Sequence, residues 1–96
     1  MQTLIKDVIA VSASDVSGQR RFRGRLQPDS TVGEMIQGFV ATMRLPRNGA
    51  GGEPLVYHAL LEREGRHLHA SERVSQALLP EDRVVLQPNV DAGGRP

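Results

Sequence analysis

The sequence predicts an α+β fold in which one main helix packs across a mixed sheet of four to five strands, in the order ββαββ. Three observations support this fold class. Residues 32–43 carry apolar side chains at helical spacing. Two strand-like runs joined by a turn precede this helix, and further strand-like runs follow it, the last over residues 83–88. A chain of 96 residues, 39% of them hydrophobic, can form one such domain around a single core.

The first two strands are expected to form a β-hairpin. Residues 4–13 are rich in β-branched side chains, and residues 15–18 supply turn chemistry. In residues 20–26, Phe22 and Leu26 fall on one side of the strand and arginines dominate the other. The second strand therefore has one apolar face and one cationic face.

The helix carries a start signal, an apolar stripe and a stop signal. Thr31 and Glu34 have the spacing of a capping box. The apolar positions that follow at helical spacing are Val32, Met35, Ile36, Phe39, Val40 and Met43. Gly33 and Gly38 each cost about 1 kcal/mol relative to alanine, so the helix is expected to depend on packing. The helix should end before Pro46, because the residue before proline avoids helical backbone angles.

Short elements are predicted for the second half of the chain. These are a loop at 47–54, a strand at 55–62, a turn at 64–65, a short strand at 66–69 with Leu68 inward, a helical turn within 71–80 and a final strand at 83–88. Residues 59–63 also fit a helix. We predict one domain over residues 1–89 and a flexible tail over residues 90–96.

Composition argues against several classes of protein. The net charge of +1 and the three aromatic residues give little basis for binding nucleic acid. No apolar run is long enough to span a membrane, and the N-terminus lacks the pattern of a signal peptide, so we expect a cytoplasmic protein. There are no cysteines and hence no disulfide.

Catalytic and metal-binding patterns are also missing. The sequence has no nucleophile elbow, phosphate-binding loop or dinucleotide fingerprint, so we expect no enzymatic activity and no cofactor. His67 and His69 would share one face of a strand, with His58 nearby in sequence. A structural zinc site requires four ligands, so these histidines are interpreted as surface residues rather than as a metal site.

Two features remain as candidate sites. The first is the densest charge cluster, formed by Arg20, Arg21, Arg23 and Arg25. It is either a solvated strand face or a docking surface for an acidic partner, with Arg21, Arg23 and Arg25 as the surface residues.

The second candidate is the C-terminal Gly93-Gly94 pair, which Arg95 and Pro96 follow. Because glycine has no side chain, a terminal glycine carboxylate can enter a narrow enzyme channel and be activated there. A peptidase would first have to remove Arg95 and Pro96. The alternative interpretation is a frayed, glycine-rich chain end.

Several segments together resemble those of ubiquitin-like proteins. Residues 29–36 resemble the opening of the family's helix, and residues 66–78 resemble a short strand that leads to a small helical turn. Residues 82–86 resemble the final strand, and residues 92–94 stand where conjugated members carry a di-glycine. The resemblance implies a β-grasp fold, with the first and last strands parallel at the centre of the sheet.

The resemblance implies a non-enzymatic protein modifier, and the arginine-rich, lysine-poor composition favours a bacterial origin. After cleavage behind Gly94, the glycine carboxylate would pass through an adenylating enzyme and a cysteine carrier enzyme to amines on target proteins. Lys6, the only lysine, is the candidate acceptor for conjugation to another copy. The alternatives are an unconjugated β-grasp interaction module, like the accessory proteins of bacterial secretion systems, and a sulfur carrier.

Overall fold

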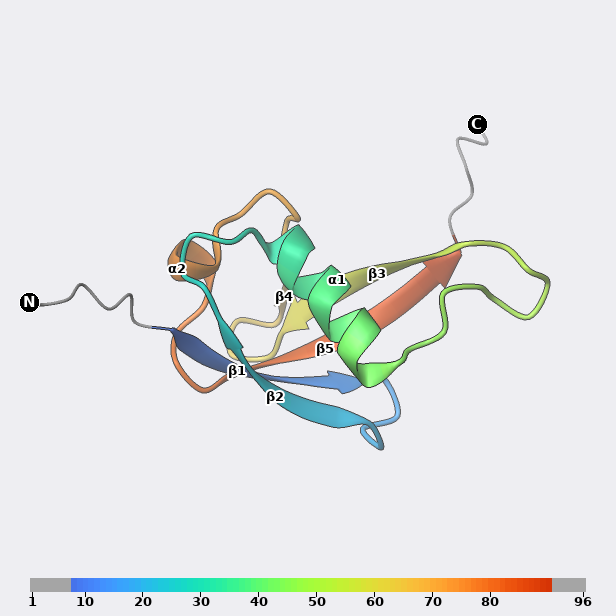
Figure 1. Ribbon diagram of the computed structural model, residues 1–96, viewed down its shortest axis with the longest axis horizontal. Helices are drawn as coiled ribbons and strands as arrows, with labels where there is room; N and C mark the ends of the chain where they lie inside the picture. Colours follow the sequence, from blue (N-terminus) through green and yellow to red (C-terminus); the bar gives the residue numbers. More distant parts are fainter. Residues whose placement is uncertain (1–7, 91–96) are drawn as a thin grey trace, which may run out of the picture.

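The computed structural model of the 96-residue protein describes residues 8–90. The elements are β1 (Ile9–Asp15), β2 (Arg21–Leu26), α1 (Val32–Met43), β3 (Leu55–Leu61), β4 (Arg66–His67), α2 (Val74–Ala77) and β5 (Asp82–Val90). The strands form one sheet in the order β2-β1-β5-β3-β4, and α1 crosses one face of it (Figure 1). The predicted α+β class and the main-helix architecture are confirmed.

The first and last strands are parallel neighbours at the centre of the sheet. β1 pairs in parallel with β5, while the β1–β2, β3–β5 and β3–β4 pairs are antiparallel. A parallel pair needs a long crossover connection, and here α1, β3, β4 and α2 all lie within it. This arrangement is the one implied by the resemblance.

The N-terminal hairpin is present, with the first strand shifted toward its turn. β1 ends at Asp15, two residues later than predicted, and predicted strand residues 4–7 lie outside the described part of the chain. The Asp15 carboxylate accepts hydrogen bonds from the Ser17 hydroxyl at 2.9 Å and the Arg20 N–H at 3.3 Å. The aspartate therefore belongs to the strand and organises the turn at the same time.

Helix α1 begins with the predicted capping box. The Glu34 N–H donates to Thr31 Oγ1 at 3.1 Å, and the Thr31 N–H donates to Glu34 Oε1 at 2.9 Å. The predicted stripe is buried from Val32 to Val40, whereas Met43 is only half-buried. Arg44 takes a left-handed conformation (φ 57°), which ends the helix and turns the chain so that Leu45 enters the core.

The middle strands differ in length from the prediction. Residues 55–61 form a strand, so the alternative helix over residues 59–63 is wrong. β4 contains only Arg66 and His67, because the His69 N–H donates to a Glu72 carboxylate oxygen at 2.7 Å and the chain leaves the sheet. Leu68 is buried, as expected for the inward residue of this segment.

Strand β5 is longer than predicted and continues through Pro88 to Val90. The backbone groups of successive strand residues point to alternate neighbouring strands. The Arg83 carbonyl accepts a hydrogen bond from the Glu62 N–H on the β3 side, so the backbone groups of Pro88, five residues later, point to the β1 side. The pairing with β1 ends at Leu86. The missing N–H of Pro88 therefore costs no sheet hydrogen bond, and the strand does not stop there.

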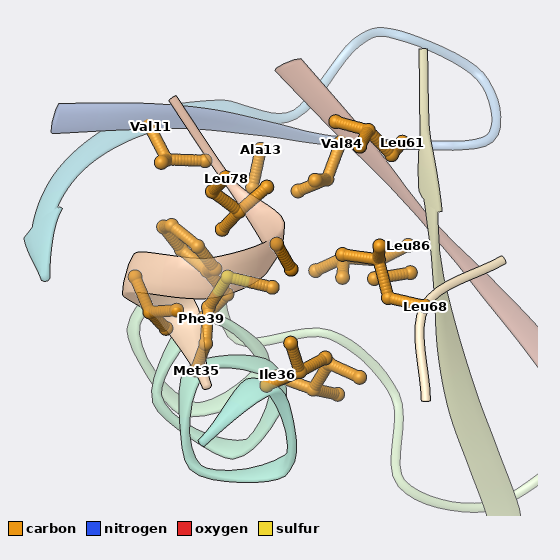
Figure 2. Packing of buried hydrophobic residues seen from close by; sticks show 14 of the residues in the cluster. Val11, Ala13, Met35, Ile36, Phe39, Leu61, Leu68, Leu78, Val84 and Leu86 are labelled. Atoms are coloured by element: carbon orange, nitrogen blue, oxygen red, sulfur yellow. The ribbon is translucent and has the colours of Figure 1, made fainter. Parts of the chain in front are cut away.

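The core lies between α1 and the sheet. Met35, Ile36 and Phe39 face Val11, Ala13, Val84 and Leu86 across this layer, while Leu78 lies beside Ala13 and Leu68 beside Leu86 (Figure 2). Because every second residue of β1, β3 and β5 points into this layer, the residues between them occupy the opposite, open face of the sheet.

Candidate functional site: the open face of the sheet

The sheet register places residues distant in sequence in common rows on the open face. Ser12 lies opposite Arg23 on β2 and opposite Arg83 on β5, so these three residues form one row. In the next row, Ser14 lies opposite Arg21 and Val85. Arginines thus stand on both sides of the small serines of β1.

This difference in side-chain length produces a hollow of about 320 Å³, which we call the cationic trough. Its polar lining residues are Ser12, Ser14, Arg21, Arg23, Glu62 and Arg83. The two serines are half-buried and the four charged residues are exposed. The lining therefore carries three positive charges and one negative charge.

The arginines of the trough differ in how far they are already paired. Arg23 donates to both carboxylate oxygens of Glu81, one at 3.1 Å, and this hydrogen bonding raises the pKa of Arg23 and lowers that of Glu81. Arg21 donates to the Gly18 carbonyl at 3.0 Å and to no carboxylate within residues 8–90. The Arg83 guanidinium has no hydrogen-bonding or ionic partner in that same range, although the Arg83 backbone is paired in the sheet.

The predicted cluster of four arginines is separated by the fold. Arg21, Arg23 and Arg25 occupy the open face, because their strand positions alternate with those of Phe22 and Gly24. Arg25 lies opposite Ala10, outside the trough lining. Arg20 instead donates to the Arg44 carbonyl at 2.9 Å, at the end of α1.

The other side of β2 borders an apolar groove. This groove of about 600 Å³ runs between β2 and α1, where Phe22, Met35, Gly38 and Phe39 contribute to its lining. Phe22 is 41% exposed, and its ring meets that of Phe39 edge-on with centroids 6.2 Å apart. The apolar face predicted for the second strand is therefore only partly covered.

The histidines are arranged differently from the sequence-based expectation. His67 ends β4, so His69 does not share a strand face with it. The neighbour of His67 is His58 on β3, with ring centroids 6.3 Å apart, and His67 Nε2 lies 2.6 Å from Gln87 Oε1. Within residues 8–90, no group of three or more His, Cys, Asp and Glu residues is arranged to hold a metal ion.

The last residues of β5 pair with β3 only. Asn89 pairs with Val56 and Val90 with Leu55, beyond the last residue of β5 that pairs with β1 (Figure 1). Among residues 8–90, the strand end is therefore flanked by β3 alone. The sequence-predicted residues Gly93, Gly94 and Arg95, like the candidate acceptor Lys6, lie outside the described residues.

Sequence reasoning missed the residues that complete the trough. Arg83 occupies an outward position of the final strand, and Ser12 and Ser14 occupy outward positions of the first. Strand alternation indicates that each faces away from the core, but only the parallel β1–β5 pairing brings them together.

In the described part of the chain, no helix has the length and apolar character needed to cross a membrane.

Comparison with known proteins yields matches in structure only. No protein-family model matches the chain, and no curated protein matches it in sequence. A ubiquitin from Caldiarchaeum subterraneum is 23% identical with a TM-score of 0.60, over 90% of this chain and 99% of that one. A designed protein based on ubiquitin gives 14% identity and a TM-score of 0.67, over 92% and 96% of the two chains.

A third match is a chain of the MycP5-free ESX-5 inner membrane complex. It is 15% identical with a TM-score of 0.63, and the match covers 94% of this protein but only 23% of the larger chain. Two of the three matched chains are a ubiquitin and a design based on ubiquitin. The protein therefore has the ubiquitin-like β-grasp fold.

Proposed function

We propose that the protein is a ubiquitin-like modifier that is joined to amines through the carboxylate of Gly94. The observation that carries this proposal is the position of the Gly93-Gly94 pair directly behind the last strand of a ubiquitin-like fold. β5 ends at Val90, and only Asp91 and Ala92 separate it from the pair. In the described part of the chain only β3 flanks the strand end, so an activating enzyme can approach from the β1 side.

The proposed chemistry takes place in partner enzymes, in the cytoplasm. A peptidase hydrolyses the Gly94–Arg95 bond and frees the Gly94 carboxylate. This carboxylate attacks the α-phosphate of ATP in an adenylating enzyme, with release of pyrophosphate. A cysteine thiolate then displaces AMP to form a thioester, and an amine of a target protein displaces the thiolate. The chain itself supplies no catalytic group and no cofactor.

The test is intact mass measurement after incubation with the cognate peptidase, adenylating enzyme and carrier. We expect loss of Arg95 and Pro96, followed by an adduct joined through Gly94, which Gly94→Ala abolishes. Gly38→Ala is the matched control, because it makes the same chemical change where an added Cβ meets no atom within 4 Å. An unchanged mass with enzymes that process their own substrates would overturn the proposal.

The second candidate function is an unconjugated interaction module. It is supported by the likeness to part of a chain in the ESX-5 inner membrane complex and by the exposed trough on the open face. In this case the Gly94→Ala variant should bind its partner as the unmodified chain does. A sulfur carrier would instead exchange one oxygen of the freed Gly94 carboxylate for sulfur, which the same mass measurement detects.

A further inference from the structure

We propose that the cationic trough binds an extended acidic segment of a partner protein, with carboxylates at alternate positions. The inference goes beyond the chemistry of the tail, because every group that it uses belongs to the folded body. It applies to a conjugated protein and to an unconjugated one alike.

The charges of the trough favour an anionic ligand. Three arginines line it against Glu62 alone, and Arg21 and Arg83 have no carboxylate partner within residues 8–90. Glu81 neutralises part of the charge of Arg23, and Glu62 and Glu81 both border a second hollow beside Arg83. The unpaired positive charge is therefore concentrated at Arg21 and Arg83, on the two sides of β1.

The spacing of the arginines matches an extended peptide. Arg23 and Arg83 stand in one row across Ser12, and Arg21 stands in the next row on the same face. Successive rows on one face of a sheet are about 7 Å apart, which is also the separation of residues i and i+2 in an extended chain. A peptide aligned with β1 can therefore present one carboxylate to each row.

The serines supply further donors at the bottom of the trough. Ser12 and Ser14 are half-buried, and their hydroxyl groups have no hydrogen-bond partner among the described residues. A hydroxyl can donate to a carboxylate, and hydrogen bonds to charged acceptors are stronger than neutral ones. Carboxylates held between Arg21, Arg23 and Arg83 would lie above these unused donors.

The probe is a short peptide of alternating Glu and Ser, with a Gln-for-Glu peptide as its uncharged counterpart. We expect backbone amide NMR signals of residues 12–14, 21–23 and 83 to shift with the acidic peptide alone, and the shifts to weaken as salt is added. Shifts centred on the groove between β2 and α1 would overturn the assignment. So would tighter binding of a single-stranded oligonucleotide at the same residues.

Charge variants separate a specific site from general attraction. Arg21→Glu or Arg83→Glu reverses the charge of one arginine and should weaken peptide binding by about tenfold. This is the size of effect expected from the loss of two exposed charge pairs. Arg47→Glu makes the same change at an exposed position in the loop between α1 and β3, and it should weaken binding by less than about twofold. Equal losses in all three variants would show general attraction and overturn the proposal.

A gain of affinity cannot arise from unfolding. Glu81→Gln releases Arg23, and Glu62→Gln removes the opposing charge, so each should tighten peptide binding by about two- to fivefold. Unchanged or weaker binding in both variants would overturn the proposal. Gly94→Ala should leave peptide binding unchanged, so failure of the trough and failure of the conjugation chemistry give different results.

Discussion

Replacing Gly24 with alanine tests how closely β2 approaches α1. A Cβ at this position would lie 3.0 Å from Phe39 Cε1, 3.3 Å from Phe39 Cζ and 3.4 Å from Phe22 Cε2. The Phe39 ring is buried, with 3% of its surface exposed, and it packs edge-on against Phe22. The ring must therefore shift within the core to accept the added methyl group.

Two opposing terms set the size of the effect. Overpacking of a core costs about 1–3 kcal/mol. Alanine also restricts the unfolded chain, which stabilises the folded state by about 0.4–1 kcal/mol. We expect Gly24→Ala to lower the free energy of unfolding by about 1 kcal/mol net.

Gly38 provides a control for the same chemical change. It lies on an exposed position of α1, where an added Cβ meets no atom within 4 Å. Alanine in a helix interior is favoured over glycine by about 1 kcal/mol, so Gly38→Ala should raise the free energy of unfolding by that amount. The same substitution should therefore have opposite signs on the two sides of the groove.

The assay is urea unfolding followed by circular dichroism. With a slope of about 1–3 kcal/mol per molar urea, the midpoint should fall by about 0.3–1 M for Gly24→Ala and rise by a similar amount for Gly38→Ala. Phe39→Leu should lower the free energy of unfolding by less in the Gly24→Ala variant than in the unmodified protein, because leucine relieves the contact with the added methyl group. A Gly24→Ala midpoint at or above that of the unmodified protein, or additive costs in the double variant, would refute the packing argument.

Three further predictions concern stability. Thr31→Ala removes one half of the capping box and should lower the free energy of unfolding by about 1 kcal/mol, measured by urea unfolding. Leu86→Ala should cost about 2–5 kcal/mol in the same assay, because this side chain is fully buried at 0% exposure. The Arg66 guanidinium, with the His69 N–H, lowers the pKa of Glu72 from 4.5 to about 2. The stabilisation from ionised Glu72 is therefore present above pH 4.5 and lost as the pH falls toward 2. When the free energy of unfolding is measured at falling pH, Glu72→Gln should lose less of it over this range than the unmodified protein does.

The helix and the hairpin could be predicted because their signals are local. The capping box, the stripe from Val32 to Val40 and the alternation in β2 each involve residues a few positions apart. The ends of β4 and β5 could not be predicted in the same way. β4 ends where the Glu72 carboxylate accepts a hydrogen bond from the His69 N–H. β5 continues past Pro88 because, among the described residues, no strand pairs with it on the β1 side there.

Only the β2 side of the trough could be predicted from the sequence. The arginines of β2 are visible as an alternating cationic run, and the structure confirms their common face. Arg83 completes the trough from β5, far away in the sequence. Only the parallel pairing of β5 with β1 places it beside the arginines of β2. The pairing of Arg23 with Glu81 is equally non-local, so the sequence could not show which arginines remain unpaired.

One strand carries both the core and the trough, so the register of β5 controls both. Val84 and Leu86 point into the core while Arg83 points into the trough, and a slip of one residue would exchange these roles. Asp82 opposes such a slip. Its buried carboxylate accepts from Arg63 Nε at 2.9 Å, from Arg63 Nη2 at 3.0 Å and from the Leu79 N–H at 2.8 Å. A slip would separate these groups and leave the carboxylate buried without its partners, which is costly. The arginine bond holds the pKa of Asp82 below its usual value. The carboxylate therefore keeps its charge, and with it the two bonds from Arg63, to a lower pH than an ordinary aspartate would.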